Sequence, residues 1–215
     1  SDLHLASISG GTDICGCFVS AVPTLPVYAG EIQGACLGMA VDVFNEKGKS
    51  LTADQKGELV CTKPFPSMPI GFWNDDKYSN YLNSYFSKFD GIWTHGDFAS
   101  KSINSGFVIH GRSDATLNSK GVRIGTAEIY RVVEQHDDVI ESLVFGQSFD
   151  NDVRIVLAVK LRQDVGLSES LIADLKSRIR TACTPRHVPA VVISVADLPR
   201  TRSNKLVELA VADAV

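Results

Sequence analysis

Two short polar segments in the first half of this 215-residue chain carry side chains that could bind a nucleotide and its metal ion. The first reads GGTD and comprises Gly10, Gly11, Thr12 and Asp13. Small residues let a backbone approach a ligand closely, a threonine hydroxyl can donate to a phosphate, and a carboxylate can ligate a hard cation such as Mg²⁺. In the second segment, Asp97 follows a glycine at the end of an apolar strand, where it could accept two hydrogen bonds from a ribose diol. A plain turn capped by an aspartate would give either pattern, so neither segment is specific by itself.

Two cationic segments follow in the second half. Arg112 and Asp114 form a charged pair after the apolar strand 107–109, which we expect to break at Gly111. Lys205 closes the run LPRTRSNK. A lysine on a loop after a proline is usually a solvated charge, so this run also needs its context before it can be read as a site.

The segments between these residues indicate a mixed α+β chain. Short apolar runs broken by glycines over residues 27–60 predict a small antiparallel barrel or sheet. A glycine-flanked hairpin is expected around residues 119–121. Gly125 and Thr126 then open a helix, for which we predict Thr126 as the N-cap.

The remaining elements predict a small domain of two helices over three strands. Apolar runs indicate the strands, and leucine and isoleucine residues spaced three and four apart indicate a helix that Ser168 would cap. The expected strands cover residues 139–146, 153–161 and 188–195, with a tight turn at 149–152, and the expected helix covers 168–182. Helices that cover a sheet in this way form a layered α+β domain.

Composition describes a soluble globular protein. Hydrophobic residues make up 44% of the chain and the net charge is −4, so there is no basic excess to indicate nucleic acid and no apolar run long enough to cross a membrane. The cysteines number five and lack CxxC spacing, which predicts buried thiols in a reducing compartment instead of disulfides or a zinc site. We recognise no export signal, so the cytoplasm is the expected location.

Taken in order, these segments resemble the adenylate-forming enzymes, the superfamily of acyl-CoA synthetases, peptide-synthetase adenylation domains and luciferases. The string GFVIHGRSDATLNSKGVRIGTAEI, residues 106–129, resembles their hinge motif, in which a Gly-Arg-x-Asp run joins a large N-terminal domain to a small C-terminal one. GGTD resembles their Gly-x-Thr-Glu run with Asp13 in place of the glutamate, and HGD resembles their Thr-Gly-Asp run. The run that ends at Lys205 resembles Leu-Pro-Lys-Thr-x-Ser-Gly-Lys, with Arg200 for lysine and Asn204 for glycine. Asparagine tolerates a left-handed backbone, so the second change is mild.

The resemblance implies two domains joined at Asp114. Residues 1–112 would be the β-rich, C-terminal part of the N-terminal adenylating domain, and residues 113–215 would be the mobile α+β C-terminal domain that acts as a lid. In this family the small domain rotates about the hinge residue between the two half-reactions.

The resemblance also assigns roles to particular residues. Lys205 would be the catalytic cation of the first half-reaction, in which a carboxylate and ATP give an acyl-adenylate and pyrophosphate, and Asp13 would ligate Mg²⁺. The expected ATP- or AMP-binding residues are Gly10, Gly11, Thr12, Asp97, Ile109, Arg112 and Arg123. In the second half-reaction the thiol of coenzyme A attacks the acyl-adenylate, and its expected binding residues are Lys120, Gly121 and Arg180.

A complete enzyme of this family also needs a Ser/Thr/Gly-rich phosphate loop followed by lysine, and the chain has no such run. We therefore expect it to be the last third of a larger ligase and to be inactive alone. KPFPSMPIGFWND and WTHGDFA, residues 63–75 and 93–99, most resemble the branch that converts acetoacetate to acetoacetyl-CoA. Two alternatives stay open, an acetate- or propionate-type synthetase and a non-catalytic nucleotide- or coenzyme-binding module.

Overall fold

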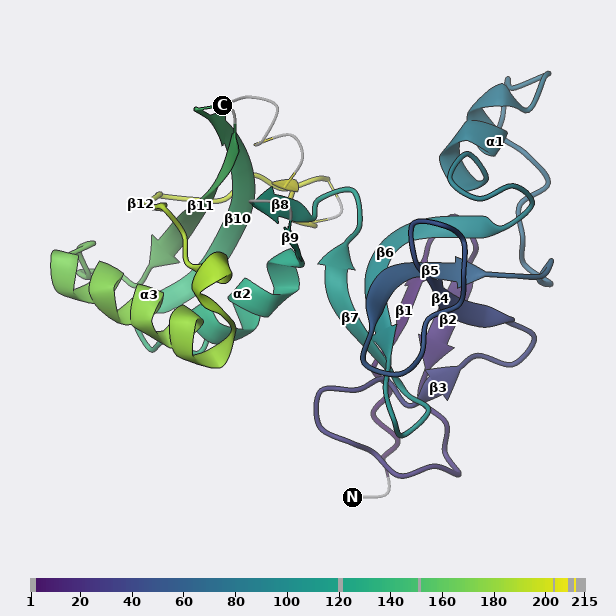
Figure 1. Ribbon diagram of the computed structural model, residues 1–215, viewed down its shortest axis with the longest axis horizontal. Helices are drawn as coiled ribbons and strands as arrows, with labels where there is room; N and C mark the ends of the chain where they lie inside the picture. The colour runs from purple at the N-terminus through teal and green to yellow at the C-terminus, as the bar shows by residue number, and fades with distance from the viewer. Residues whose placement is uncertain (1–2, 120–121, 151, 203, 209–210, 212–215) are drawn as a thin grey trace. The chain divides into compact units, whose positions relative to one another are not determined.

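The computed structural model of the protein describes residues 3–119, 122–150, 152–202, 204–208 and 211 (Figure 1). The chain divides into two compact units, Ser1–His110 and Gly111–Val215, which we call unit 1 and unit 2 and describe separately. Strands dominate unit 1, and unit 2 mixes strands with two helices. The predicted α+β class is therefore confirmed.

Two sheets form the framework of unit 1. The first has the order β1 (Ser9–Gly11), β2 (Gly16–Ser20), β3 (Gly34–Ala35), and both of its pairings are antiparallel. The second has the order β4 (Val41–Phe44), β5 (Lys56–Cys61), β6 (Trp93–Lys101), β7 (Phe107–Arg112), with antiparallel pairing from β4 to β6. The antiparallel sheet expected over residues 27–60 is thus present.

Strand β7 corrects one expectation. It does not break at Gly111 but continues to Arg112. Gly111 has a φ of 128°, which a residue with a Cβ rarely adopts, so the glycine changes the backbone direction without ending the strand.

Aromatic residues fill the core of unit 1 around Trp93, which is almost fully buried. Tyr85 stacks on the Trp93 ring at 3.8 Å between ring centroids, and Phe65 and Phe86 meet it edge-on. Tyr85 is the last residue of the short helix α1 (Ser79–Tyr85). The stacking therefore holds α1 against β6.

Unit 2 is built on a three-stranded sheet of order β10 (Val139–Phe149), β11 (Asp152–Leu161), β12 (Val191–Ser194). The first pair is antiparallel and the second is parallel, because α3 (Glu169–Ala182) and a 3₁₀ turn at Pro185–His187 connect β11 to β12. A separate hairpin pairs β8 (Leu117–Ser119) with β9 (Val122–Ile124), and its turn, residues 120–121, lies outside the described residues. The predicted strands and hairpin are confirmed.

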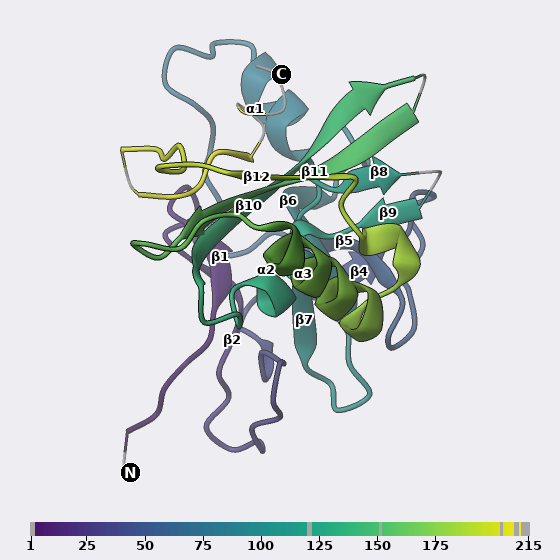
Figure 2. The same cartoon turned by 90° about the vertical axis from the view of Figure 1, so that its left-hand side faces the viewer.

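Helices α2 (Thr126–Val133) and α3 lie side by side on one face of this sheet (Figures 1 and 2). Ser168 caps α3 as expected, since its Oγ accepts a hydrogen bond from the Leu171 N–H at 3.2 Å. The prediction that Thr126 caps α2 is wrong. Gly125 is the N-cap, and its N–H donates to the Glu128 carboxylate at 3.1 Å, while Thr126 is buried inside the first turn.

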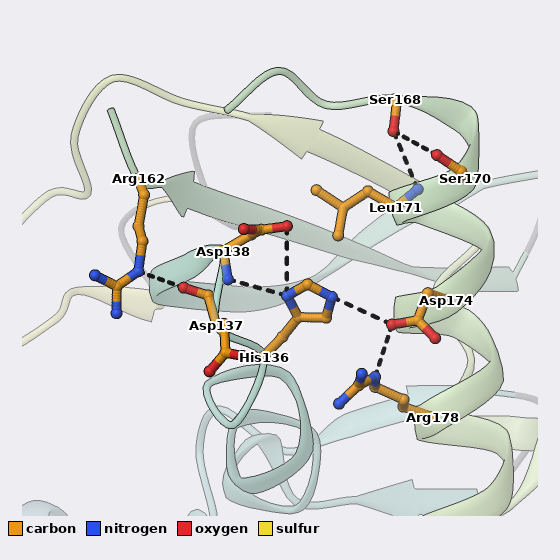
Figure 3. Close-up of polar contacts among 9 residues, drawn as sticks. All are labelled: His136, Asp137, Asp138, Arg162, Ser168, Ser170, Leu171, Asp174 and Arg178. Atoms are coloured by element: carbon orange, nitrogen blue, oxygen red, sulfur yellow. Dashed lines mark hydrogen bonds and ion pairs between the residues drawn. The ribbon is translucent and has the colours of Figure 1, made fainter. Parts of the chain in front are cut away.

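The two helices are also cross-linked by polar side chains (Figure 3). His136, which follows α2, places its Nε2 3.2 Å from the Asp174 carboxylate on α3, and Asp174 also accepts a bond from Arg178 at 2.7 Å. The other ring nitrogen of His136 accepts a bond from the Asp138 N–H at 3.1 Å. These bonds fix the end of α2 to the middle of α3.

The segment that carries Lys205 covers the opposite face of the sheet. Buried residues of β10 and β11 on that face pack against Leu198, with Leu206 and Val211 packed beside them. The sheet is therefore buried on both faces, and the C-terminal segment is part of the packed structure of unit 2.

Among the described residues, no helix combines the length and the apolar character needed to cross a membrane.

Candidate functional site

The GGTD segment forms the end of β1 and the turn that follows it. Thr12 and Asp13 are exposed, and the Thr12 carbonyl accepts the Cys15 N–H at 3.3 Å. A Cβ on Gly10 would lie 2.2 Å from the Gly16 carbonyl oxygen. The glycine at position 10 is thus required by the close approach of β2, whatever ligand the turn binds.

Gly11 allows the turn to fold back onto β6. A Cβ at this position would lie 2.1 Å from Asp13 Oδ1 and 2.7 Å from His95 Nε2. His95 is held on β6 by a hydrogen bond from Trp93 Nε1 at 3.4 Å and by edge-on contact with Phe18. The turn, Asp13 and the His95 ring therefore meet around one glycine.

The Asp13 carboxylate is held in place by two donors. Its Oδ2 accepts the Tyr85 hydroxyl at 2.6 Å, and its Oδ1 accepts the Ile14 N–H at 3.1 Å. Burial raises the pKa of Tyr85, and the bond to Asp13 raises it further. The phenol is therefore a neutral donor throughout the physiological range, and it orients the predicted metal ligand.

Asp97 is almost fully buried and lies in the middle of β6, not at the end of a strand as expected. Its Oδ2 accepts the hydroxyl of Ser9 at 3.1 Å, which ties β1 to β6. Ile109, half-buried, packs from β7 against the core of unit 1. Unit 1 thus brings the predicted phosphate- and metal-binding turn next to the predicted ribose ligand, although 88 residues separate Ser9 from Asp97.

The donor set around Asp13 fits a metal ion that is shared with a phosphate. In the described part of the chain no three carboxylate, histidine or cysteine side chains cluster as a metal cage. Mg²⁺ does not need such a cage, since it is commonly held by one or two carboxylates together with substrate phosphates and water. A single exposed, oriented carboxylate is consistent with that mode of binding.

The hinge segment contains an ion pair. Arg112 Nη2 lies 2.9 Å from Asp114 Oδ2, and Arg112 Nε donates to Asp114 Oδ1 at 3.2 Å. Asp114 lies in a turn between β7 and β8, and both side chains are about half exposed. The predicted hinge residue is thus in irregular backbone at the start of unit 2, and its side chain binds the predicted ribose ligand.

Lys205 ends a tight loop. The Thr201 N–H donates to the Lys205 carbonyl at 2.8 Å, the Lys205 N–H donates to Thr201 Oγ1 at 3.1 Å, and the Asn204 N–H donates to the Thr201 carbonyl at 2.9 Å. Asn204 has a φ of 66°, which confirms that asparagine takes the left-handed conformation expected at this position. The Lys205 side chain is exposed.

Arg200 ties the same loop to the sheet. Its Nη1 donates to the Asn204 carbonyl at 2.9 Å, and its Nη2 pairs with the Glu141 carboxylate on β10. Arg200, which replaces the lysine of the family motif, thus holds the loop to β10. Its planar guanidinium carries several N–H donors, so it can bind both partners at once.

The other predicted residues of unit 2 are spread over separate segments. Arg123 lies half-buried on β9, and Arg180 is exposed in the last turn of α3. Lys120 and Gly121 lie outside the described residues. In this unit the structure brings Arg112 and Asp114 together, whereas Arg123, Arg180 and Lys205 occupy three different elements.

Two site residues, Tyr85 and Ser9, were missed by the sequence analysis. Tyr85 lies in a polar stretch with several tyrosines, and it meets Asp13 across 72 residues. Nothing in the local pattern distinguishes it from its neighbours, so only the packing of α1 on β6 identifies it. Ser9 directly precedes the GGTD run, which is the one local signal that could have included it.

Most of unit 2 matches a known protein family. A family model described as the AMP-binding enzyme C-terminal domain matches residues 128–205. The matched range begins in the first turn of α2 and ends at Lys205, so it covers most of unit 2.

The similarity to acetoacetyl-CoA synthetases extends over the whole chain. The chain is 59% identical over 214 residues to the acetoacetyl-coenzyme A synthetase of Rhizobium meliloti. It is 45% identical over 217 residues to the acetoacetyl-CoA synthetase of Xenopus tropicalis, and both alignments cover 100% of the chain. They cover 33% and 32% of those relatives, so the chain spans about a third of the length of the curated relatives that it matches. A structure titled as acetoacetyl-CoA synthetase from Streptomyces lividans superposes with a TM-score of 0.90 at 45% identity, over 97% of this chain and 31% of that one.

These matches confirm the resemblance to adenylate-forming enzymes that the hinge and the terminal-lysine motifs indicated. They also confirm that the chain corresponds to one part of a longer protein in its relatives. The individual roles assigned to the site residues stay predictions.

Proposed function

We propose that this chain is the C-terminal third of an AMP-forming acid–CoA ligase that converts acetoacetate, ATP and coenzyme A to acetoacetyl-CoA, AMP and pyrophosphate. The observation that carries the proposal is the identity of 59% with an acetoacetyl-CoA synthetase over the whole chain. The exposed Lys205 at the end of a tight loop and the hinge turn at Asp114 support it, because the chemistry needs a cation that can be delivered and withdrawn.

The first half-reaction joins two anions. The carboxylate oxygen of the acid attacks the α-phosphorus of ATP, and the bond to pyrophosphate breaks. Lys205 would lie between the carboxylate and phosphate oxygens and stabilise the charge that shifts between them. Its exposed side chain, on a loop fixed by Thr201 and Asn204, is suited to this role.

Residues of the predicted motifs would hold the nucleotide. Asp97, fixed by Ser9, would accept hydrogen bonds from the ribose, and Arg112 would donate to it. The GGTD turn would approach the phosphates, with Asp13 as a ligand of Mg²⁺. When bound, Mg²⁺ would neutralise charge on the phosphates.

The second half-reaction needs Lys205 withdrawn and a thiol admitted. Rotation of unit 2 at Asp114 would do both, and the turn of the β8–β9 hairpin, residues Lys120 and Gly121, would then face coenzyme A. Arg123 on β9 would meet a nucleotide phosphate before the rotation and coenzyme A after it, and Arg180 on α3 would bind phosphates of the coenzyme. The thiol sulfur then forms the thioester bond as AMP leaves.

We further propose that the ligase works in the cytoplasm with small-molecule partners. The five cysteines support this, since all of them are free thiols. The prediction that these thiols are buried is correct only for Cys61, and Cys15 is exposed. An exposed thiol such as Cys15 persists in a reducing compartment.

The test is a thioester-forming assay on the full-length protein that contains this chain. Acetoacetate, acetate and propionate are compared at equal concentrations with ATP, Mg²⁺ and coenzyme A, and AMP and acyl-CoA are both quantified. We expect acetoacetate to give the highest kcat/KM. A preference for acetate or propionate would still support an acid–CoA ligase, but it would contradict acetoacetate as the acid substrate.

A second arm separates catalysis from simple binding. If the full-length protein binds ATP or coenzyme A but releases no pyrophosphate with any acid of the panel, the ligase proposal is wrong. A non-catalytic binding module would then be the better description. The fragment alone should show no acid-dependent exchange of pyrophosphate into ATP.

A further inference from the structure

The chain beyond Lys205 returns to the body of unit 2, where a part-buried polar contact joins it to α2. Leu206 pairs with Arg200 in an antiparallel bridge, and the Val207 N–H donates to the Pro199 carbonyl at 3.2 Å. One residue later, the Glu208 carboxylate accepts a hydrogen bond from the hydroxyl of Tyr130 on α2. The contact joins residues 78 positions apart and lies three residues after the lysine.

Tyr130 connects three elements at once. Its ring belongs to α2, and its oxygen accepts the Val144 N–H of β10 at 3.1 Å while its proton goes to Glu208. Burial raises the pKa of Tyr130, and the neighbouring Glu208 raises it further, so the hydroxyl keeps its proton. The residue is therefore placed to tie the C-terminal segment to both the helix and the sheet.

The Glu208 side chain lies in a confined environment. It lines a cavity of about 210 Å³ with Leu117, Val144 and Phe145, and Asp114 of the hinge turn lines the same cavity. The charged groups that face Glu208 are Asp114 and Arg112. A carboxyl in such a cavity costs free energy unless donors meet it, and the hydroxyls of Tyr130 and Thr126 are such donors.

The Lys205 loop is thus attached on both sides. Before the lysine, Arg200 pairs with Glu141 on β10, and after it, Glu208 bonds to Tyr130 on α2. Between these attachments, Lys205 carries an exposed side chain with four rotatable bonds. A cation that must be delivered to one position benefits when its backbone is held at two points.

We propose that Tyr130 and Glu208 are a positioning pair for Lys205, which fixes the lysine loop to the α2–β10 body so that the amine moves with unit 2 as one piece. This rests on the proposed function for its catalytic consequence, but the attachment itself does not. Tyr130 and Glu208 act through the loop and touch no reacting atom.

Hydrogen exchange tests the attachment independently of activity. In the full-length protein, Tyr130→Phe and Glu208→Ala should each speed amide exchange in residues 198–208 by about tenfold, the effect of losing one buried hydrogen bond. Glu208→Gln, which keeps an acceptor oxygen, should restore most of the protection. The matched control is Glu134→Ala. Glu134 also ties α2 to β10, through bonds of 3.0 Å from the Ser142 N–H and hydroxyl, and within the described part of the chain these bonds do not involve the C-terminal segment.

Half-reaction kinetics test the consequence for Lys205. Tyr130→Phe should lower kcat for acyl-adenylate formation about tenfold while the KM for ATP stays within a factor of two. Thioester formation from supplied acyl-adenylate should keep the wild-type rate, because Lys205 is withdrawn in that step. A variant that is merely less stable would lose both half-reactions together.

The outcomes separate the two proposals. If exchange in residues 198–208 is the same in Tyr130→Phe as in Glu134→Ala, the positioning pair does not exist. If exchange rises but adenylation and thioester formation fall equally, the pair stabilises the fold and does not position Lys205. If the wild type has no ligase activity, the proposed function fails, and the exchange result still decides whether the attachment is real.

Discussion

Arg112 and Asp114 are joined by two hydrogen bonds, Nε to Oδ1 at 3.2 Å and Nη2 to Oδ2 at 2.9 Å. The pair lies where the chain enters unit 2, and its residues are the predicted ribose ligand and the predicted hinge. Because both side chains are about half exposed, the pair contributes little to stability. If the backbone rotates at Asp114, as the hinge prediction requires, the Asp114 carboxylate would move relative to the Arg112 guanidinium and the ion pair could break.

The hinge role predicts different effects on the two half-reactions. Asp114→Pro freezes φ at residue 114, so we expect acyl-adenylate formation to stay measurable and thioester formation to be abolished. Pyrophosphate release and acyl-CoA formation are measured separately on the full-length protein. Asp114→Ala is the control, because it removes the ion pair and leaves φ free. Equal loss of both half-reactions in the proline variant would contradict the assignment.

Lys205→Ala should slow acyl-adenylate formation by about 100- to 1000-fold, roughly 3 to 4 kcal/mol, as expected when one preorganised donor is lost. Thioester formation from supplied acyl-adenylate should continue at close to the wild-type rate. Lys176→Ala serves as the matched control, since Lys176 is a lysine of the same unit on the surface of α3. Adenylation that survives in Lys205→Ala would place the catalytic cation elsewhere.

Tyr85→Phe should weaken metal use without disturbing the core. The ring that stacks on Trp93 is kept, but Asp13 Oδ2 loses its 2.6 Å donor, so of the two donors in the described part of the chain only the Ile14 N–H, at 3.1 Å, still orients the carboxylate. We expect the Mg²⁺ concentration for half-maximal adenylation to rise by about tenfold, the lower end of the effect of one hydrogen bond to a charged group. Tyr81→Phe controls for loss of a tyrosine hydroxyl, because Tyr81 donates to the Pro69 carbonyl instead. Equal metal requirements in both variants would argue against an orienting role for Tyr85.

The raised pKa of Glu208 predicts that the stability of the C-terminal segment depends on pH. Burial raises the pKa of Glu208 above its ordinary 4.5, the nearby Asp114 adds to this, and the bond from Tyr130 opposes it. The folded state therefore holds the proton more tightly than the unfolded state, and stability is lost as pH rises from 4.5 through the raised pKa. Protection factors of residues 198–208 should fall over this window in the wild type and stay flat in Glu208→Gln. Protection that instead rises with pH would reverse the sign and exclude this account.

The lowered pKa of Asp75 predicts the opposite pH dependence for the stability of helix α1. Its carboxylate accepts the N–H groups of Tyr81 and Asn80 at 2.9 and 3.2 Å, and chiefly the bond from Tyr81 lowers the pKa of Asp75 below its ordinary 3.8. This stabilisation is present above pH 3.8 and is lost as pH falls below it. Asp75→Asn should reduce the protection of residues 79–85 at pH 7, and the difference from wild type should shrink in acid. A constant difference would show that charge on Asp75 does not matter.

Local sequence patterns predicted most elements of unit 2. The Ser168 cap and the apolar spacing of Leu171, Leu175 and Ile179 define α3, because side chains three and four residues apart share one face of a helix. The same reasoning failed at Thr126, where a good capping residue is used inside the helix and the preceding glycine caps it. It also failed at Gly111, which bends β7 without ending it. At both positions the residue type allows more than one backbone role, and the local pattern does not choose between them.

The sequence by itself determined the family resemblance, the mixed fold class and the segments that carry chemistry, because motif order and hydrophobic period are local properties of the chain. Only the tertiary structure decided that Tyr85 orients Asp13, that Ser9 fixes Asp97 and that Tyr130 binds Glu208. Each of these pairs joins residues more than 70 positions apart. Such contacts depend on how strands and helices pack, and no periodicity of one segment encodes its partner.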